Sequence, residues 1–175
     1  MFKKRKPVLI IALIAVSAIT VSFIADLEYK DVVGGELKML IPKDFIHIPR
    51  EAYKKHYDDE PTPDDYYCNK DTSEDIVFAK LPRQLPDLSM AKQMGQMALL
   101  DSTNKVHFND TTTVNGNKVY LLDLDGMGLG KLKYVKTFIV NTPTSSILCV
   151  IECNTDHKKT WKPISDQIFN SIKIK

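Results

Sequence analysis

One stretch of this chain has the residue types of a phosphate-binding loop. The segment 126–131 alternates glycine with other residues and ends in lysine. A phosphate loop needs a further glycine, separated from its Gly-Lys pair by four residues, then a Ser or Thr after the lysine and a following helix. Here Asp125 stands at the first glycine position, Leu132 stands at the hydroxyl position, and a strand pattern follows. The segment is therefore interpreted as a flexible hairpin turn.

The histidines, which commonly serve as acid-base groups and metal ligands, are scattered along the chain. They are His47, His56, His107 and His157. None has a partner at a metal-ligand spacing, and neither an HExxH pattern, a GxSxG elbow nor a CxxC pair is present. The sequence therefore predicts no catalytic residue, no metal site and no cofactor.

The residues between Arg50 and Asp75 combine carboxylates with tyrosines. Nine acids face four bases, and two prolines interrupt any helix, so a long loop is predicted, with a possible short strand at 66–68. The acid spacing does not fit an EF-hand, so a calcium site is not predicted. Tyrosine offers contact area at low entropic cost, and carboxylates complement a basic partner. The predicted partner-binding residues are Tyr57, Asp58, Asp59, Glu60, Asp64, Asp65, Tyr66 and Tyr67.

Three cysteines leave the redox state open. Cys149 and Cys153 are four residues apart in a predicted strand, which places their Cα atoms roughly 13 Å apart. That distance is too long for a disulfide, so a bridge would have to join Cys68 to one of them. The alternative is that all three are free and pack as small apolar side chains.

The N-terminus has the pattern of a membrane segment. Residues 1–6 carry four basic side chains, and residues 7–25 are uncharged and mostly apolar. A helix of that length spans roughly 28 Å, about the thickness of a bilayer core. The basic flank predicts a cytoplasmic start and a C-terminal domain on the extracytoplasmic side. The segment is either an uncleaved single-pass anchor or a cleaved signal peptide.

The rest of the chain is nearly neutral. Without the four N-terminal basic residues, 20 basic residues face 22 acidic ones. Such a balance provides no basic face for nucleic acid, so no nucleic-acid partner is expected. We predict a linker at 26–36 and one globular domain at 37–175.

The predicted elements alternate strands with single helices. Strands are expected at 37–42, 76–81, 106–108, 119–125, 132–140, 147–153 and 172–174, with helices at 88–104 and from about Thr160. The Asn115-Gly116 pair predicts a tight hairpin, and the run 147–153, apolar on both faces, predicts a central strand. Short turns between most strands favour an α+β domain with a mostly antiparallel sheet flanked by helices.

Three methionines share one side of the first predicted helix. Met90, Met94 and Met97 recur at helical spacing. Such a row either fills a core or forms an adaptable binding face. Core filling is the preferred interpretation here.

Four stretches resemble the Mog1/PsbP-like domains, which include the DcrB-like proteins. They are the entry strand with its proline and aromatic residue (37–45), a helix that follows an early strand, the Gly-x-Lys turn into long strands (114–120), and the closing helix, serine and strand (168–174). The resemblance implies an α/β/α sandwich around an antiparallel sheet. It also implies a binding, assembly, chaperone or accessory role. The family has no common active-site residues that could be assigned to positions of this sequence.

These observations lead to three functional hypotheses. The first is a membrane-tethered, non-enzymatic module that recognises a protein partner in the cell envelope. The second is an immunity-type inhibitor of a delivered toxin, whose acidic loop would enter a basic cleft. The third is a hydrolase with a site assembled from loops, for which a buried carboxylate of raised pKa in a deep pocket would be the sign.

Overall fold

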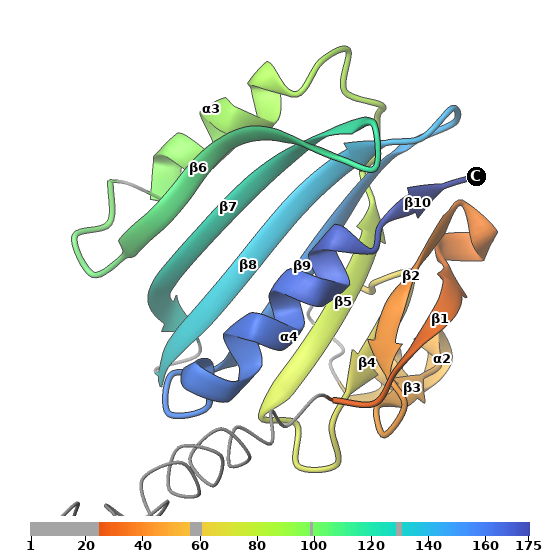
Figure 1. Cartoon of the computed structure of the whole chain (residues 1–175), viewed down its shortest axis with the longest axis vertical. Helices are drawn as coiled ribbons and strands as arrows, with labels where there is room; N and C mark the ends of the chain where they lie inside the picture. Colours follow the sequence, from red (N-terminus) through yellow and green to blue (C-terminus); the bar gives the residue numbers. More distant parts are fainter. Residues whose placement is uncertain (1–24, 57–60, 99, 129–130) are drawn as a thin grey trace, which may run out of the picture.

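The computed structural model describes residues 25–56, 61–98, 100–128 and 131–175, and Figure 1 shows how they are arranged. The main sheet has the strand order β3-β4-β5-β9-β8-β7-β6, and a small sheet has the order β1-β2-β10. The main-sheet strands are β3 (Ile46–Ile48), β4 (Asp65–Cys68), β5 (Glu74–Lys80), β6 (Lys105–Val114), β7 (Asn117–Gly128), β8 (Lys131–Asn141) and β9 (Ser146–Asn154). All the strand pairs in these described ranges are antiparallel, which confirms the predicted mostly antiparallel sheet.

The centre and the hairpin of the main sheet follow the sequence predictions. Strand β9 lies between β5 and β8, as expected for a run that is apolar on both faces. The β6–β7 turn is built on Asn115 and Gly116, whose φ angles are 49° and 82°. Positive φ at both positions is what a tight type I′ hairpin turn requires. Strand β6 is ten residues long, whereas only residues 106–108 were predicted, and β7 runs through the first part of the predicted glycine loop.

Helices cover both faces of the main sheet. Helix α4 (Lys158–Asn170) lies on one face together with the small sheet, and α3 (Ser89–Ala98) lies on the other (Figure 1). Trp161, Ile164 and Ile168 of α4 are buried in the larger core, as their helical spacing predicts. Helix α4 begins two residues before the predicted start, and α3 ends six residues before its predicted end.

The predicted linker at 26–36 is wrong, because most of it is a strand of the domain. Strand β1 (Leu27–Val32) pairs with β2 (Leu37–Pro42), which in turn pairs with β10 (Lys173–Ile174). A short 3-10 turn, η1 (Val33–Gly35), joins β1 to β2. The polar residues of β1 suggested a stalk, but one face of a small antiparallel sheet can face water, so alternating polarity is compatible with pairing.

The acidic segment is also more structured than predicted. It contains helix α2 (Arg50–His56) and strand β4 in addition to loops. Strand β4 confirms the short strand suggested near residues 66–68. Pro61 and Pro63 follow α2 and so do not interrupt it.

The predicted membrane segment 7–25 lies outside the described residues apart from Ala25. Among the helices that the structure describes, none is long and apolar enough to cross a bilayer.

Candidate functional site

The predicted acidic and tyrosine surface is only partly placed by the structure. Tyr57, Asp58, Asp59 and Glu60 lie outside the described residues. Asp64 and Asp65 are described, and the carboxylate of each accepts a hydrogen bond from a backbone amide of another segment. Asp64 Oδ2 accepts a hydrogen bond of 2.6 Å from the Lys80 amide, and Asp65 Oδ2 accepts one of 2.5 Å from the Val33 amide. These two carboxylates therefore contribute to the fold itself.

The two remaining tyrosines of that prediction are buried. Tyr66 is 9% exposed and Tyr67 is 5% exposed. The Tyr67 ring packs edge-on against Phe78 and lies beside His47, and burial raises the pKa of Tyr67 to about 12. Neither ring offers the contact area that the sequence prediction assigned to it.

The methionine row of α3 is a surface, so the core-filling interpretation is wrong. Met90, Met94 and Met97 are 45%, 57% and 71% exposed. Small residues contact the sheet in their place: Ala91 is fully buried, and a β-carbon on Gly95 would lie 1.7 Å from the Tyr120 hydroxyl oxygen. Because α3 sits so close to the sheet on this small-residue stripe, the long methionine side chains remain outside.

The methionine row lies on the flank of α3 that faces away from the sheet edge. Lys92 Nζ lies 3.0 Å from a carboxylate oxygen of Asp110 on the edge strand β6. Consecutive residues of an α-helix are about 100° apart around its axis. Lys92 therefore points to one flank of α3, and Met90, Met94 and Met97 point on average to the opposite flank. The methionines therefore lie on the side of α3 toward the middle strands of the sheet.

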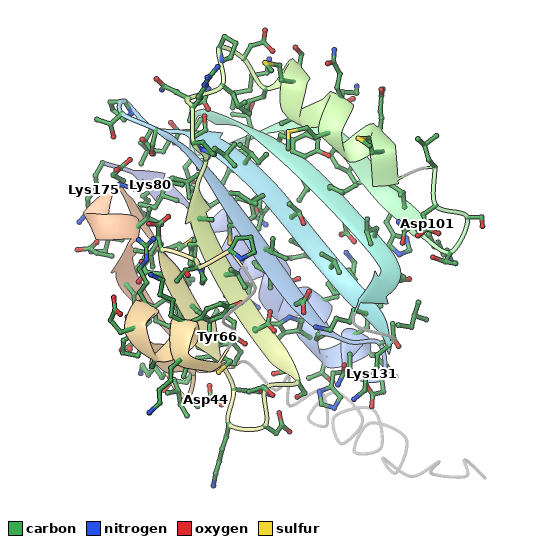
Figure 2. All side chains as sticks on the ribbon, turned by 180° about the vertical axis from the view of Figure 1, so that it is seen from behind. Asp44, Tyr66, Lys80, Asp101, Lys131 and Lys175 are labelled. Atoms are coloured by element: carbon green, nitrogen blue, oxygen red, sulfur yellow. The ribbon has the colours of Figure 1, made fainter. Side chains whose placement is uncertain are left out.

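Those middle strands present a face that is covered only in part. In Figure 2, α3 and α2 lie over different parts of this face, with β5, β9 and β8 visible between them. Most side chains that point to this side of the three strands are partly buried, Asp75 and Ile139 being the buried exceptions, whereas their neighbours toward α4 are fully buried. We call this the central sheet face; its side chains are Val77, Val135, Thr137, Leu148 and Val150, with the Lys133–Glu152 ion pair toward one end. This face and the methionine row lie on the same side of the main sheet.

A buried carboxyl group lies at one end of this face. Asp75 of β5 is 8% exposed, and its Oδ1 has no hydrogen-bond partner among the described residues. Burial raises the pKa of Asp75 to about 7, although the charge of Lys133 acts in the opposite direction. Asp75 is not among the residues that line the two hollows described below.

The face of the main sheet beneath α4 carries charged side chains that pair with one another. Asp123 of β7 accepts hydrogen bonds from Lys162 Nζ at 2.7 Å and from the Tyr134 hydroxyl at 3.1 Å, and it pairs with Lys136 Nζ at 3.4 Å. Lys136 also pairs with Asp166 of α4 at 2.6 Å. These contacts join α4 to β7 and β8, and they identify the network as part of the packing.

His47 and His107 each pair with one carboxylate, whereas His157 lies 3.3 Å from Glu74 and 4.0 Å from Asp156. His47 lies 2.9 Å from Asp65, and His107 lies 2.9 Å from Asp125. No group of three His, Cys, Asp or Glu side chains in the described ranges could hold a metal ion.

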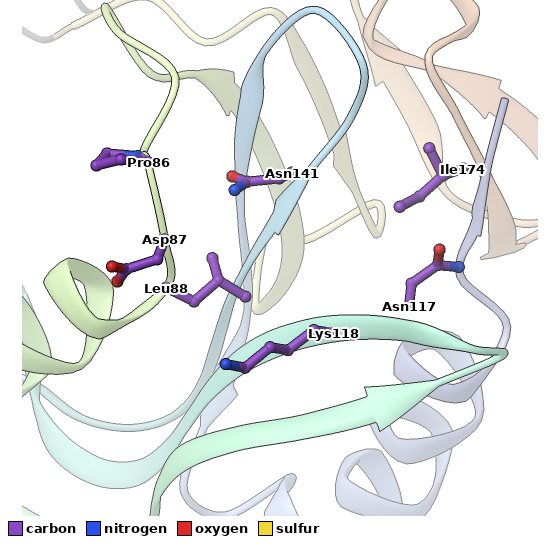
Figure 3. Close-up of a pocket in the computed structure, with 7 residues that line it drawn as sticks. All are labelled: Pro86, Asp87, Leu88, Asn117, Lys118, Asn141 and Ile174. Atoms are coloured by element: carbon purple, nitrogen blue, oxygen red, sulfur yellow. The ribbon is translucent and has the colours of Figure 1, made fainter.

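One hollow in the described surface, of about 220 Å³, has Asp44, Glu74 and Thr160 in its lining. Another, of about 330 Å³, lies where α3 begins, and Figure 3 shows its lining. Its charged members are Asp87 and Lys118, and its Asn141 side chain already bonds the Leu85 carbonyl and the Ser146 hydroxyl. Asp87 itself accepts a hydrogen bond from the Ser89 amide at the start of α3. The Asn141 and Asp87 side chains therefore stabilise the fold through these hydrogen bonds.

The three cysteines are free and buried. Cys149 and Cys153 point toward α4, whereas Cys68 pairs in register with Asp75 and so points to the opposite side of the sheet. Strand β5 separates Cys68 from β9, which puts the strands about 10 Å apart. A disulfide from Cys68 to either of the others is therefore incompatible with this fold.

Comparison with solved structures shows a shared fold. The cyanobacterial PsbP (CyanoP) of Synechocystis is 14% identical, with a TM-score of 0.59 over 87% of this chain and 94% of that one. LpqN, involved in cell envelope biogenesis of Mycobacterium tuberculosis, is 15% identical, with a TM-score of 0.55 over 85% and 91%. PA94 of Pseudomonas aeruginosa, a protein of unknown function, is 9% identical, with a TM-score of 0.50 over 85% and 97%. No protein-family model matches the sequence, and no curated protein matches it.

Proposed function

The chain has the Mog1/PsbP-like fold, and from this premise we propose that it is a membrane-tethered, non-enzymatic accessory module that binds a protein partner outside the cytoplasm. The partner-binding surface in this proposal is the methionine row of α3 together with the central sheet face. The observation that carries it is the exposure of Met90, Met94 and Met97 on a helix fixed to the sheet.

The chemistry of this surface suits a protein segment. Methionine is unbranched and polarizable, so a row of methionines adapts to apolar side chains of varied shape. Contiguous exposed apolar side chains on a soluble domain commonly mark an interaction site. Ala91 and Gly95 hold the helix backbone close to Tyr120, so the row is presented by a rigid element and loses little backbone freedom on binding.

The position of α3 favours a protein over the membrane as the occupant. Strand β1 follows directly after the predicted membrane segment, and it lies on the opposite side of the main sheet from α3 (Figure 1). A tether at β1 would therefore hold the domain with α3 directed away from the bilayer. Ala25 and Leu27 pack against the larger core, so the tether would have almost no flexible spacer to reverse this orientation.

The experiment that tests the proposal compares charge changes at the methionine positions with charge changes at other exposed positions of the same helix. The full chain carries a photo-crosslinking residue at position 90, which is exposed and is changed in neither variant, and crosslinked species are captured from native membranes. The test variant combines Met94→Glu with Met97→Glu. The control variant combines Gln93→Glu with Gln96→Glu, which adds the same charge at exposed positions of the same helix. Urea unfolding of all three proteins checks that the fold is retained.

We expect one defined protein to crosslink to the wild type and to the control variant, and to be lost from the methionine variant. The captured species is then purified, and its affinity for the three proteins is measured in solution. Binding that is equal for all three, or lost equally in both variants, would remove the methionine row from the proposal.

A further inference from the structure

The outer face of the small sheet carries a cluster of lysine and tyrosine side chains. Leu37, Met39 and Ile41 of β2 point into the core and are fully buried, so Lys38 and Leu40 point outward. The register places Tyr29 of β1 opposite Leu40 and Lys173 of β10 opposite Lys38. Tyr29 and the two lysines therefore share one exposed face with Asp31, which is opposite Lys38 in β1 and pairs with Lys175 at 2.6 Å.

The two lysines of this face are like charges on adjacent strands. Directly opposed like charges destabilise a sheet pair. Among the described residues, neither Lys38 nor Lys173 forms an ion pair with a carboxylate. Both ammonium groups instead lie over the ring of Tyr29, at 5.7 Å from its centroid for Lys38 and 4.2 Å for Lys173. The Tyr29 ring is 45% exposed, so an anion can approach both charges from solvent.

We propose that this face, formed by Tyr29, Lys38 and Lys173, contacts the phosphate groups of anionic phospholipids beside the tether. The inference rests on the membrane tether of the proposed function, and it is independent of the methionine row. An anionic headgroup between the two lysines offsets their mutual repulsion, which the Asp31 carboxylate, paired with Lys175, offsets only for Lys38.

The position of the face selects a lipid as the source of the anion. Strand β1 begins at Leu27, two residues after the last residue of the predicted membrane segment. The small sheet lies on the side of the main sheet opposite α3 (Figure 1), so the orientation that exposes the methionine row brings this sheet to the bilayer. Tyrosine and lysine are typical residues of the membrane interface, where the ring sits at headgroup level and the ammonium groups meet anionic lipid.

The test uses lysine acetylation followed by mass spectrometry, because this method reports on each lysine separately. The full chain is reconstituted in nanodiscs made either of phosphatidylcholine alone or of phosphatidylcholine with phosphatidylglycerol. Lys92, which lies on α3, serves as the internal control. A third sample contains phosphatidylcholine nanodiscs with inorganic phosphate at the same concentration as the anionic lipid.

We expect Lys38 and Lys173 to be acetylated about fivefold more slowly in the anionic nanodiscs, a factor that corresponds to ~1 kcal/mol per basic residue near an anionic surface. Lys92 should react at the same rate in all samples. Equal rates for Lys38 and Lys173 in the two kinds of nanodisc would overturn the proposal. Protection by inorganic phosphate alone would also overturn it, because the site would then be one for a free anion.

One variant and one further measurement distinguish a failure of this lipid contact from a failure of the proposed function. Tyr29→Ser should reduce the protection of both lysines, because the ring that holds their ammonium groups together is lost, while capture through α3 stays unchanged. Alkaline extraction of native membranes reports on the tether itself. A chain released by alkali would remove the tether and this inference together, whereas a retained chain with unprotected lysines would remove this inference alone.

Discussion

Gly95 of α3 and Tyr120 of β7 are in such close contact that a β-carbon at position 95 would lie 1.7 Å from the Tyr120 hydroxyl oxygen. That hydroxyl donates a hydrogen bond of 3.0 Å to Asn109 Oδ1, and Tyr120 is 2% exposed, so the ring has little freedom to move. This contact sets how near α3 lies to the sheet, and thereby which side chains of the helix remain exposed.

We predict that Gly95→Ala destabilises the protein, even though alanine is the better helix former. Overpacking of a rigid site costs about 1–3 kcal/mol, which exceeds the gain of about 0.5–1 kcal/mol from replacing a helical glycine. Urea unfolding measures the change. Tyr120→Phe removes the clashing oxygen, so the double variant should recover part of the loss in a double-mutant cycle. A Gly95→Ala protein as stable as the wild type would show that α3 can move outward at no cost.

Asp75 should make the protein less stable as the pH rises. Burial raises its pKa from the usual 3.8 to about 7 in the folded state. Between about pH 4 and pH 7 the folded state then binds more protons than the unfolded state, so the free energy of unfolding falls as the pH rises through this window. At about 1.4 kcal/mol per pKa unit, the penalty above pH 7 is a few kcal/mol.

We therefore expect Asp75→Asn to be more stable than the wild type at pH 8, with a flatter stability profile between pH 4 and pH 7. Urea unfolding at a series of pH values measures both effects. Glu51→Gln, at an exposed position of α2, is the control and should follow the wild type. An Asp75→Asn protein with an unchanged slope would mean that this carboxyl group does not titrate in the window.

Asp123 should have the opposite pH dependence. Burial raises its pKa, but the hydrogen bond from Lys162 and the charges of Lys136 and Lys162 outweigh burial and hold the pKa below its usual range. Its contribution to stability is therefore present above the pKa of the unfolded state, about 3.9, and it is lost as the pH falls through the lower folded-state pKa.

Asp123→Asn should lower the free energy of unfolding by about 3–5 kcal/mol at neutral pH, because it leaves buried Lys136 without its buried carboxylate. The difference from the wild type should shrink in acid. Asp166→Asn removes a carboxylate that contacts the same lysine but is 45% exposed, so it should cost clearly less. Equal losses in the two variants, measured by urea unfolding at pH 7, would contradict the assignment of Asp123 as the centre of the network.

Asp65 should matter for folding, although it was first selected as a partner-contact residue. Its carboxylate accepts the Val33 amide, at a position where a β-branched residue has a φ of 55°. Loss of this acceptor leaves an amide of a nearly fully buried residue unpaired, at an expected cost of about 1–3 kcal/mol for Asp65→Ala. Thermal unfolding against Glu51→Ala measures this cost. If the two variants had the same melting temperature, the carboxylate would not be needed at the η1 turn.

Local patterns predicted most of the large elements correctly. The Asn115-Gly116 turn, the apolar run of β9 and the apolar stripe of α4 each follow from neighbouring residues, and the structure confirms all three. Strand β1 was missed because its alternating polar and apolar residues indicate a strand only when the pairing with β2 is known. Helix α2 was missed because prolines beyond its end were taken to interrupt it.

The candidate surface was harder to predict than the fold. Helical spacing identifies Met90, Met94 and Met97 as neighbours on one side of α3, but spacing alone does not say whether that side faces the sheet or water. The sequence did contain a signal, since Ala91 and Gly95 form a small-residue stripe beside the methionines. That stripe becomes informative only when Tyr120, 25 residues further along the chain, is known to lie against it.

By itself, the sequence of this protein determined what depends on neighbouring residues: the apolar N-terminal segment expected in a membrane, the tight hairpin, the central strand and the near-neutral charge of the domain. Only the tertiary structure decided which side chains are accessible. It buries Tyr66 and Tyr67, turns the methionine row outward, and brings Lys38 next to Lys173 from opposite ends of the domain. The physical reason is that secondary structure follows largely from local sequence, whereas exposure depends on contacts between residues that are distant along the chain.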